Sequence, residues 1–312
     1  MQEKRNIQLL ISWGVLMAVA GVLLYLGNAP SHELVDKDLF RVVDQTEVDH
    51  FTIQKSGSEL IEIRFDGSKW MVNNSFEADR QLITVFFATL LQAEPKRAVA
   101  TGQRDSISQE INQHGVQVKL YIEDEVVQDF KVIGNDRKTE TYFQLNQDNT
   151  PYLVTIPGYR VYVGSVFELT PGEWRDRRIF NFNWQNFKSL SLSHLDSKNN
   201  FTVSFQDQFF GIEGLSQADT TRLNDFLDAV SLLQASRFIE LNDTLRWERS
   251  RNQQPEFSIQ VLDIANREYA LEIFPRVPEQ SSVLGRINRQ TLALFSAQDI
   301  ARIARKRMDF KR

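Results

Sequence analysis

The sequence after about residue 30 contains an internal duplication, and this repeat limits the fold more than any other feature. Segments of the first copy recur in the second copy at a nearly constant separation of about 140 residues. The clearest pair is Glu77-Ala78-Asp79 with Gln217-Ala218-Asp219. A repeat of this length predicts two tandem lobes of one fold, because each copy is long enough to bury its own core.

Further matched segments lie on both sides of this pair, although few residues between them are identical. They comprise the end of a helix-like run, a short strand, an Asp followed by an apolar pair, and an alternating strand. In the first copy these are Leu90–Ala93, Phe51–Ile53, Asp36 with Leu39-Phe40, and Val116, Val118 and Leu120; in the second they are Leu232–Ala235, Leu190–Leu192, Asp176 with Ile179-Phe180, and Phe257, Ile259 and Val261.

Each copy shows short alternating strands, then one helix, then a second group of alternating strands. Such alternation indicates antiparallel sheet with one face in water. Apolar residues at helical spacing follow a cap at Ser75 or Asp79 in the first copy and at Ser216 in the second. The expected strands are His50–Lys55, Leu60–Phe65, Lys69–Val72, Val116–Glu123, Val126–Ile133, Thr141–Leu145 and Tyr152–Thr155, then Phe187–Ser193, Phe201–Gln206, Phe209–Ile212, Glu256–Asp263, Glu268–Phe274, Ser282–Asn288 and Thr291–Phe295.

The N-terminal residues differ from the rest of the chain. Ile7 to Leu26 is an apolar run of the length of a bilayer span, and Lys4 and Arg5 precede it. The positive-inside rule then predicts a single-pass inner-membrane protein with a cytoplasmic N-terminus and a periplasmic body. A cleaved signal peptide and a buried core helix are the alternatives.

These patterns together predict an α+β protein with an N-terminal transmembrane helix and two duplicated lobes. Each lobe is expected to be mostly antiparallel sheet with one or two helices. The predicted divisions are residues 1–30 for the cytoplasmic stub and anchor, 31–180 for the first repeat with its linker, and 181–312 for the second repeat with a basic C-terminal helix.

The composition and motifs exclude several kinds of chemistry. The chain has no cysteine, so disulfides, thiolate metal sites and cysteine nucleophiles are absent. The net charge of −5 argues against general nucleic-acid binding. None of the four histidines has metal-ligand spacing, and phosphate-loop, dinucleotide and nucleophile-elbow motifs are missing. We therefore predict no catalytic residue, no metal and no cofactor.

The linker between the copies is the first candidate site. Trp174, Arg175, Asp176, Arg177 and Arg178 form an anion or partner site in one interpretation. In the other, they form a junction in which Asp176 pairs with an arginine while the flanking aromatic and apolar residues are buried. Mixed charge beside aromatics favours the junction.

The C-terminal tail is the second candidate. Residues 296–312 are expected to form one helix with a capping box from Ser296 to Asp299. Its cations either complement the helix dipole or contact anionic headgroups or an acidic partner. The candidate contact residues are Arg302, Arg305, Lys306 and Arg307.

Several short motifs occur along the chain between turns and strands: Asp66–Trp70 followed by Ala78-Asp79, Val132–Gly134, Thr141–Phe143, Pro151–Gly158 and Trp174–Phe180. These motifs resemble those of an uncharacterised bacterial envelope family with a repeated domain of unknown function. The resemblance covers most of residues 45–295. It implies an association with gliding-motility-type auxiliary subunits of ABC transporters, and it brings no catalytic residue.

The leading hypothesis is a non-enzymatic periplasmic accessory subunit that binds other envelope proteins, such as an ABC permease or its auxiliary subunits. The alternative is a periplasmic enzyme or a glycan- or ligand-binding protein with a site between the lobes, edged by Trp174, Arg175 or Arg178. A passive spacer is the third possibility.

Overall fold

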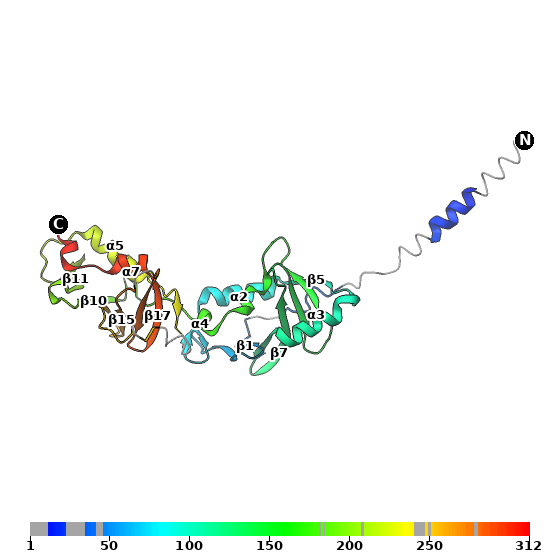
Figure 1. Cartoon of the computed structure of the whole chain (residues 1–312), viewed down its shortest axis with the longest axis horizontal. Helices are drawn as coiled ribbons and strands as arrows, with labels where there is room; N and C mark the ends of the chain where they lie inside the picture. Colours follow the sequence, from blue (N-terminus) through cyan, green and yellow to red (C-terminus); the bar gives the residue numbers. More distant parts are fainter. Residues whose placement is uncertain are drawn as a thin grey trace, which may run out of the picture. The chain divides into compact units, whose positions relative to one another are not determined.

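The computed structural model has an α+β architecture with two antiparallel sheets of nine and eight strands (Figure 1). It describes residues 12–22, 35–41, 46–180, 182–183, 185–206, 209–239, 247–248, 251–277 and 280–312 of the 312-residue chain. The α+β prediction is therefore confirmed.

The first copy contributes nine strands, in the order β4-β3-β2-β1-β6-β7-β8-β9-β5. The strands are β1 (His50–Lys55), β2 (Ile61–Phe65), β3 (Trp70–Val72), β4 (Phe76–Glu77), β5 (Glu94–Ala98), β6 (Val116–Ile122), β7 (Glu125–Gly134), β8 (Thr141–Leu145) and β9 (Tyr152–Thr155). The helices are α2 (Arg80–Gln92), α3 (Thr101–His114), the 3₁₀ helix η1 (Val163–Glu168) and α4 (Pro171–Trp174).

The second copy contributes eight strands, in the order β12-β11-β10-β14-β15-β16-β17-β13. The strands are β10 (Phe187–His194), β11 (Phe201–Gln206), β12 (Phe209–Ile212), β13 (Arg237–Phe238), β14 (Phe257–Asp263), β15 (Glu268–Ile273), β16 (Ser282–Ile287) and β17 (Thr291–Ser296). The helices are η2 (Ser197–Asn199), α5 (Thr220–Ser231), α7 (Ala297–Ile303) and η4 (Arg307–Phe310).

The two sheet orders are the same once the short edge strand β4 is set aside, which confirms the repeat. In the chain, β1, β2 and β3 precede α2 as β10, β11 and β12 precede α5. The short strands β5 and β13 follow these helices, and each ends its sheet. The repeat therefore extends over the matching strands of both sheets.

Both copies cap their central helix in the same way. The Asp79 carboxylate accepts hydrogen bonds from the backbone N–H groups of Gln81 and Leu82, at 2.8 and 3.3 Å. The Asp219 carboxylate accepts two bonds of 3.1 Å at the start of α5. Asp79 was one of the two predicted caps, whereas the prediction of Ser216 was wrong, because Asp219 satisfies the first N–H groups instead.

The sequence interpretation missed α3 and the edge strands β4, β5 and β13. In α3 only Ser108 and Ile111 are buried, so no apolar stripe marks the helix. Strands β4 and β13 have two residues each, which is too short to show alternation.

The predicted transmembrane helix over residues 7–26 is wrong. Of this run the structure describes residues 12–22, which are helical (blue in Figure 1). No helix within the described ranges is long and apolar enough to cross a bilayer. Residues 7–11 and 23–26 lie outside the described residues.

The chain divides into two compact units that do not coincide with the two copies. One includes Gln54–Ser58 and Phe87–Phe167, and the other includes Asp49–Ile53, Glu59–Phe86 and Glu168–Arg312. The lobe boundaries at 31–180 and 181–312 follow the repeat and stay a prediction.

Each unit has its own aromatic core. In the first, Phe40, Phe130, Phe143 and Phe167 are each at most 1 % exposed and pack edge-on or stacked. The second holds a continuous apolar cluster between the second sheet and α5, α7 and η4. The two sites described below lie wholly within the second unit.

Candidate functional site

The linker continues the backbone pairing of both copies. Backbone N–H groups of Asp79 and Asp176 donate to the carbonyls of Trp174 and Glu77, both at 2.8 Å. A few residues on, the N–H of Ala235 donates to the carbonyl of Arg177 at 2.8 Å. The linker is therefore ordered backbone that pairs with one copy and then with the other.

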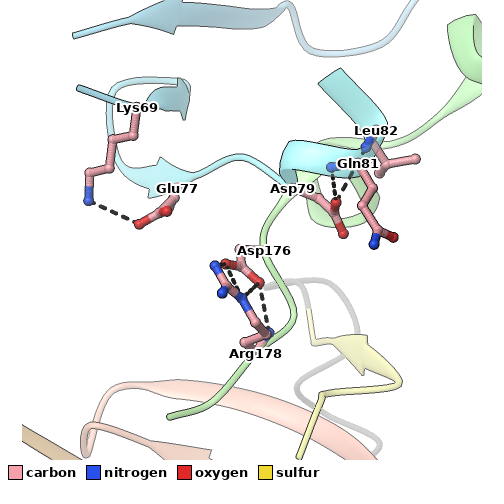
Figure 2. Close-up of polar contacts among 7 residues, drawn as sticks. All are labelled: Lys69, Glu77, Asp79, Gln81, Leu82, Asp176 and Arg178. Atoms are coloured by element: carbon pink, nitrogen blue, oxygen red, sulfur yellow. Dashed lines mark hydrogen bonds and ion pairs between the residues drawn. The ribbon is translucent and has the colours of Figure 1, made fainter. Parts of the chain in front are cut away.

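The acidic residue of the linker is held by a neighbouring arginine. Arg178 Nε donates to Asp176 Oδ2 at 2.9 Å, and a guanidinium Nη donates to the same oxygen (Figure 2). This contact raises the pKa of Arg178 further above its ordinary value. The expected pairing of Asp176 with an arginine is present, and it uses the guanidinium that an external anion would need.

Arg175 has a different environment from Arg178. Its guanidinium carbon lies 3.4 Å from the ring centroid of Phe76 on β4 and 3.8 Å from that of Phe238 on β13. Burial lowers the pKa of Arg175 to about 10, so the side chain remains charged at neutral pH. Its Nε has no hydrogen-bond partner among the described residues. Arg175 thus joins a first-copy hairpin to a second-copy strand through two aromatic faces.

Trp174, the residue before Arg175, is part of the buried core. It is fully buried, and its ring centroid lies 5.7 Å from Phe51 and 5.9 Å from Phe86. Ile179 and Phe180, on the other side of the charged residues, are buried in the second-copy core. Arg177 is exposed. The structure therefore gives Arg175 and Arg178 separate internal contacts and does not gather three arginines into one anion cradle.

The C-terminal tail repeats the geometry of the linker. The N–H of Asp219 donates to the carbonyl of Phe310 at 2.8 Å, just as the N–H of Asp79 donates to Trp174. The ring centroids of Phe310 and Phe226 on α5 are 5.5 Å apart. Trp174 packs in the same way against Phe86 on α2. We call residues 170–176 and 306–312 the closing segments, because each completes its own copy.

The single C-terminal helix predicted for residues 296–312 is wrong. Helix α7 ends at Ile303, and the 3₁₀ helix η4 starts at Arg307. Ser296 caps α7 through the N–H of Gln298, at 3.2 Å, and not through a box with Asp299. The break lets Phe310 turn into the core, which a straight helix would not allow.

This arrangement separates the four basic residues predicted as a contact surface. Arg307 donates to the backbone carbonyls of Glu213 and Gly214, and Lys306 is exposed. Arg302 and Arg305 instead line an open hollow of about 770 Å³ between α5, α7 and η4. The hollow's lining is Arg222, Asp225, Phe226, Asp228, Leu232, Arg302, Arg305, Asp309 and Phe310. A second hollow of about 180 Å³ adjoins it and shares Leu232 and Arg302.

Some of the lining charges are neutralised within the protein and others are not. Arg222 lies 3.5 Å from Asp219 and donates to the carbonyl of Asp309. No hydrogen bond or ion pair joins the side chains of Asp225, Asp228 or Arg302 to another residue in the described part of the chain. Leu232, at the end of α5, is 75 % exposed, more than any other large apolar side chain in the described ranges. The α5–α7 hollow thus presents the exposed Leu232 side chain among charged residues, of which Asp225, Asp228 and Arg302 have no partner in the described part of the chain.

The first copy serves as an internal control for this surface. Counted from the equivalent caps Asp79 and Asp219, the positions of Arg222, Asp225 and Asp228 are occupied in the first copy by Leu82, Val85 and Ala88. Counted back from Trp174 and Phe310, the positions of Arg302 and Arg305 are occupied by Val166 and Leu169. Five charged residues of the second copy therefore replace apolar ones, and the fold itself does not require them.

The family of the chain follows from comparison with known sequences. The profile of the domain of unknown function DUF4340 matches residues 70–253, which is more than half of the chain. The chain belongs to the DUF4340 family. The match begins at β3 and runs across the linker into the second copy, so the family domain includes the junction. No curated protein and no solved structure matches the chain.

The part of the hollow formed by α7 and η4 lies beyond the matched residues. Sequence reasoning selected Arg302 and Arg305 for their charge alone, and it missed Asp225, Asp228 and Leu232. The signal that could have found the two aspartates is the loss of apolar residues at repeat-equivalent positions, and no such signal marks Leu232. The described residues include no cluster of three potential metal-ligating side chains.

Proposed function

We propose that this DUF4340 protein is a non-enzymatic binding subunit of a bacterial cell-envelope assembly, and that its second copy provides the binding surface. The observation that carries the proposal is the conversion of an apolar face into the charged α5–α7 hollow in one copy only. In the second copy these positions carry exposed charged side chains, whereas the first-copy equivalents include the buried Val166, so the charges serve a purpose other than packing the core.

The side chains that line the hollow are better suited to binding a partner than to catalysis. Its side chains are guanidinium, carboxylate, aromatic and aliphatic groups, with no hydroxyl, imidazole or amine among them. Such a lining supplies directional pairing partners of both signs, as the rim of a protein interface does. A folded protein surface is the partner that offers matching charges over an area this open.

The envelope location and the ABC-type or gliding-type assembly rest on the motif resemblance around Trp174–Phe180. We propose a periplasmic position at the inner membrane, with other envelope proteins as the partners. Fractionation of the native host, with separate periplasmic, membrane and cytoplasmic markers, tests the position.

The binding role is tested by cross-linking the full chain in its native host and determining the mass and composition of the products. We expect the chain in a complex larger than a monomer, and we expect Arg302→Glu with Arg305→Glu to reduce that complex. The control, Arg251→Glu with Arg289→Glu, reverses two exposed arginines elsewhere in the second copy. Recovery of the chain only as a monomer would refute the role.

A further inference from the structure

The second closing segment, residues 306–312, lies on its own copy in the way that a bound peptide lies on a receptor. Phe310 is 1 % exposed and is the only buried residue of the segment. Its ring centroid lies 5.1 Å from that of Phe201 on β11 and 5.5 Å from that of Phe226 on α5 (Figure 1). One aromatic side chain therefore anchors the segment between a strand and a helix.

The fold holds the rest of the segment mainly through its backbone. The carbonyl of Phe310 accepts a hydrogen bond from the N–H of Asp219 at 2.8 Å, and the carbonyl of Asp309 accepts one from the Arg222 guanidinium at 3.1 Å. Arg307 is the segment's own polar side chain in contact with the fold, since it donates to two backbone carbonyls just after β12. Backbone bonds with a single side-chain pocket are a recurrent mode of peptide recognition, and the backbone bonds are equally available to another peptide.

The two closing segments show which peptide such a site accepts. Each has an acidic residue followed by an aromatic one, Glu173-Trp174 in the first copy and Asp309-Phe310 in the second. In each, the carboxylate accepts a hydrogen bond of 2.8 Å from the backbone N–H three residues earlier, at Thr170 and at Lys306. The acidic side chain thereby fixes the turn that presents the aromatic ring. The matching ligand is a turn that carries an acidic–aromatic pair.

We propose that the site beneath the second closing segment is a peptide-binding site, and that residues 306–312 are its resident ligand, which an acidic–aromatic turn of a partner protein displaces. A segment that buries one side chain opens at a lower cost than the core does. The first closing segment lacks this option, because Ile179 and Phe180 follow it and are buried in the second-copy core. The inference goes beyond the proposed function, since it requires none of the unpaired charges of the α5–α7 hollow.

The test uses the full chain and a fluorescein-labelled peptide of residues 304–312, with binding measured by fluorescence anisotropy. The tethered segment competes at an effective concentration of the order of 1 mM, so the wild type should bind the peptide weakly. Phe310→Ala removes the anchor of the resident ligand, so we expect this variant to bind the peptide at least 10-fold more tightly and to unfold at a higher temperature with the peptide present. The control peptide carries Phe310→Ala, has the same net charge and should not bind.

A second variant keeps every contact of the segment and weakens only its tether. About ten Gly and Ser residues inserted between Ala304 and Arg305 lower the effective concentration, so the peptide should bind more tightly than to the wild type. An unlabelled peptide of residues 168–178, which carries the turn with Glu173 and Trp174, should compete for the same site.

Far-UV circular dichroism establishes that each variant is folded, and the spacer variant decides the question if Phe310→Ala is not. The proposal is overturned if the folded variants bind the peptide no more tightly than the wild type, or if the control peptide binds as well as the native one. If peptide binding fails while the cross-linked complex in cells still depends on Arg302 and Arg305, the binding role stands and only the peptide site falls.

Discussion

Replacement of Arg175 provides the sharpest test of how the linker holds the second unit together. The guanidinium carbon lies 3.4 and 3.8 Å from the centroids of two phenylalanine rings. A cation over one ring contributes about 0.5–1 kcal/mol at an exposed site and about 2 kcal/mol when desolvated. Since Arg175 is partly exposed, we take about 1 kcal/mol for each ring, and Arg175→Ala should cost about 2 kcal/mol.

Burial acts in the opposite direction, because it lowers the pKa of Arg175 to about 10. This shift disfavours the cation, but solvent reaches part of the side chain and screens the penalty. Arg175→Lys keeps a charge and loses the planar stack, so we expect about half of the alanine effect. Arg175→Met keeps apolar volume between the rings and removes the desolvation cost, so it should be milder than alanine.

The assay is thermal unfolding combined with hydrogen exchange of peptides that cover β4 and β13. About 2 kcal/mol corresponds to roughly 4–8 °C in the unfolding temperature of a unit of this size. Exchange should quicken at Phe76 and Phe238 in Arg175→Ala but not in Arg177→Ala, which changes an exposed neighbour. An alanine variant as stable as the wild type, with unchanged protection of β13, would refute the role of the two rings.

Three further predictions concern features that the copies share or that differ in one of them. Asp79→Ala and Asp219→Ala should each cost about 1 kcal/mol, measured by urea unfolding, because each removes an N-cap; Asn at either position should recover most of the loss. Gly285→Ala should cost about 1–3 kcal/mol, because the added Cβ would lie 2.6 Å from Cε2 of Phe295; an unchanged unfolding midpoint would contradict this packing. Two backbone N–H groups of its own turn lower the pKa of Asp66 below 3.8, so its stabilisation of the β2–β3 hairpin is present above 3.8 and is lost as the pH falls through the folded value. Hydrogen exchange of that hairpin should therefore differ between wild type and Asp66→Asn at neutral pH and converge in acid.

The periodic parts of the fold could be predicted from the sequence. Strands with one buried face show alternation, and the buried residues Leu190 and Leu192 pair with Val261 and Ile259 as that pattern requires. Helix α3 could not be found in this way, since it buries only two residues. The expectation of a membrane span rested on the apolar length of residues 7–26 alone, and no spanning helix is found among the described residues.

The candidate sites were predictable only as charged segments. The sequence shows three arginines around Asp176, but it does not show that Phe76 and Phe238 approach Arg175 from strands more than 160 residues apart. The α5–α7 hollow is a similar case, because its charged residues come from α5, from α7 and from the residues that follow α7. Such sites depend on tertiary packing, which periodicity does not encode.

The closing segments explain why the charged hollow lies in the second copy. In the first copy, the residues after Trp174 go on to pair with the second copy, so Arg175, Asp176 and Arg178 are committed to the junction. The closing segment of the second copy makes the equivalent bond through Phe310, and the neighbouring Arg302 has no partner among the described residues. The closing segment of the first copy therefore connects the two copies. The closing segment of the second copy instead lines an open charged hollow. Substitutions at the junction should therefore affect stability, whereas substitutions in the α5–α7 hollow should affect association.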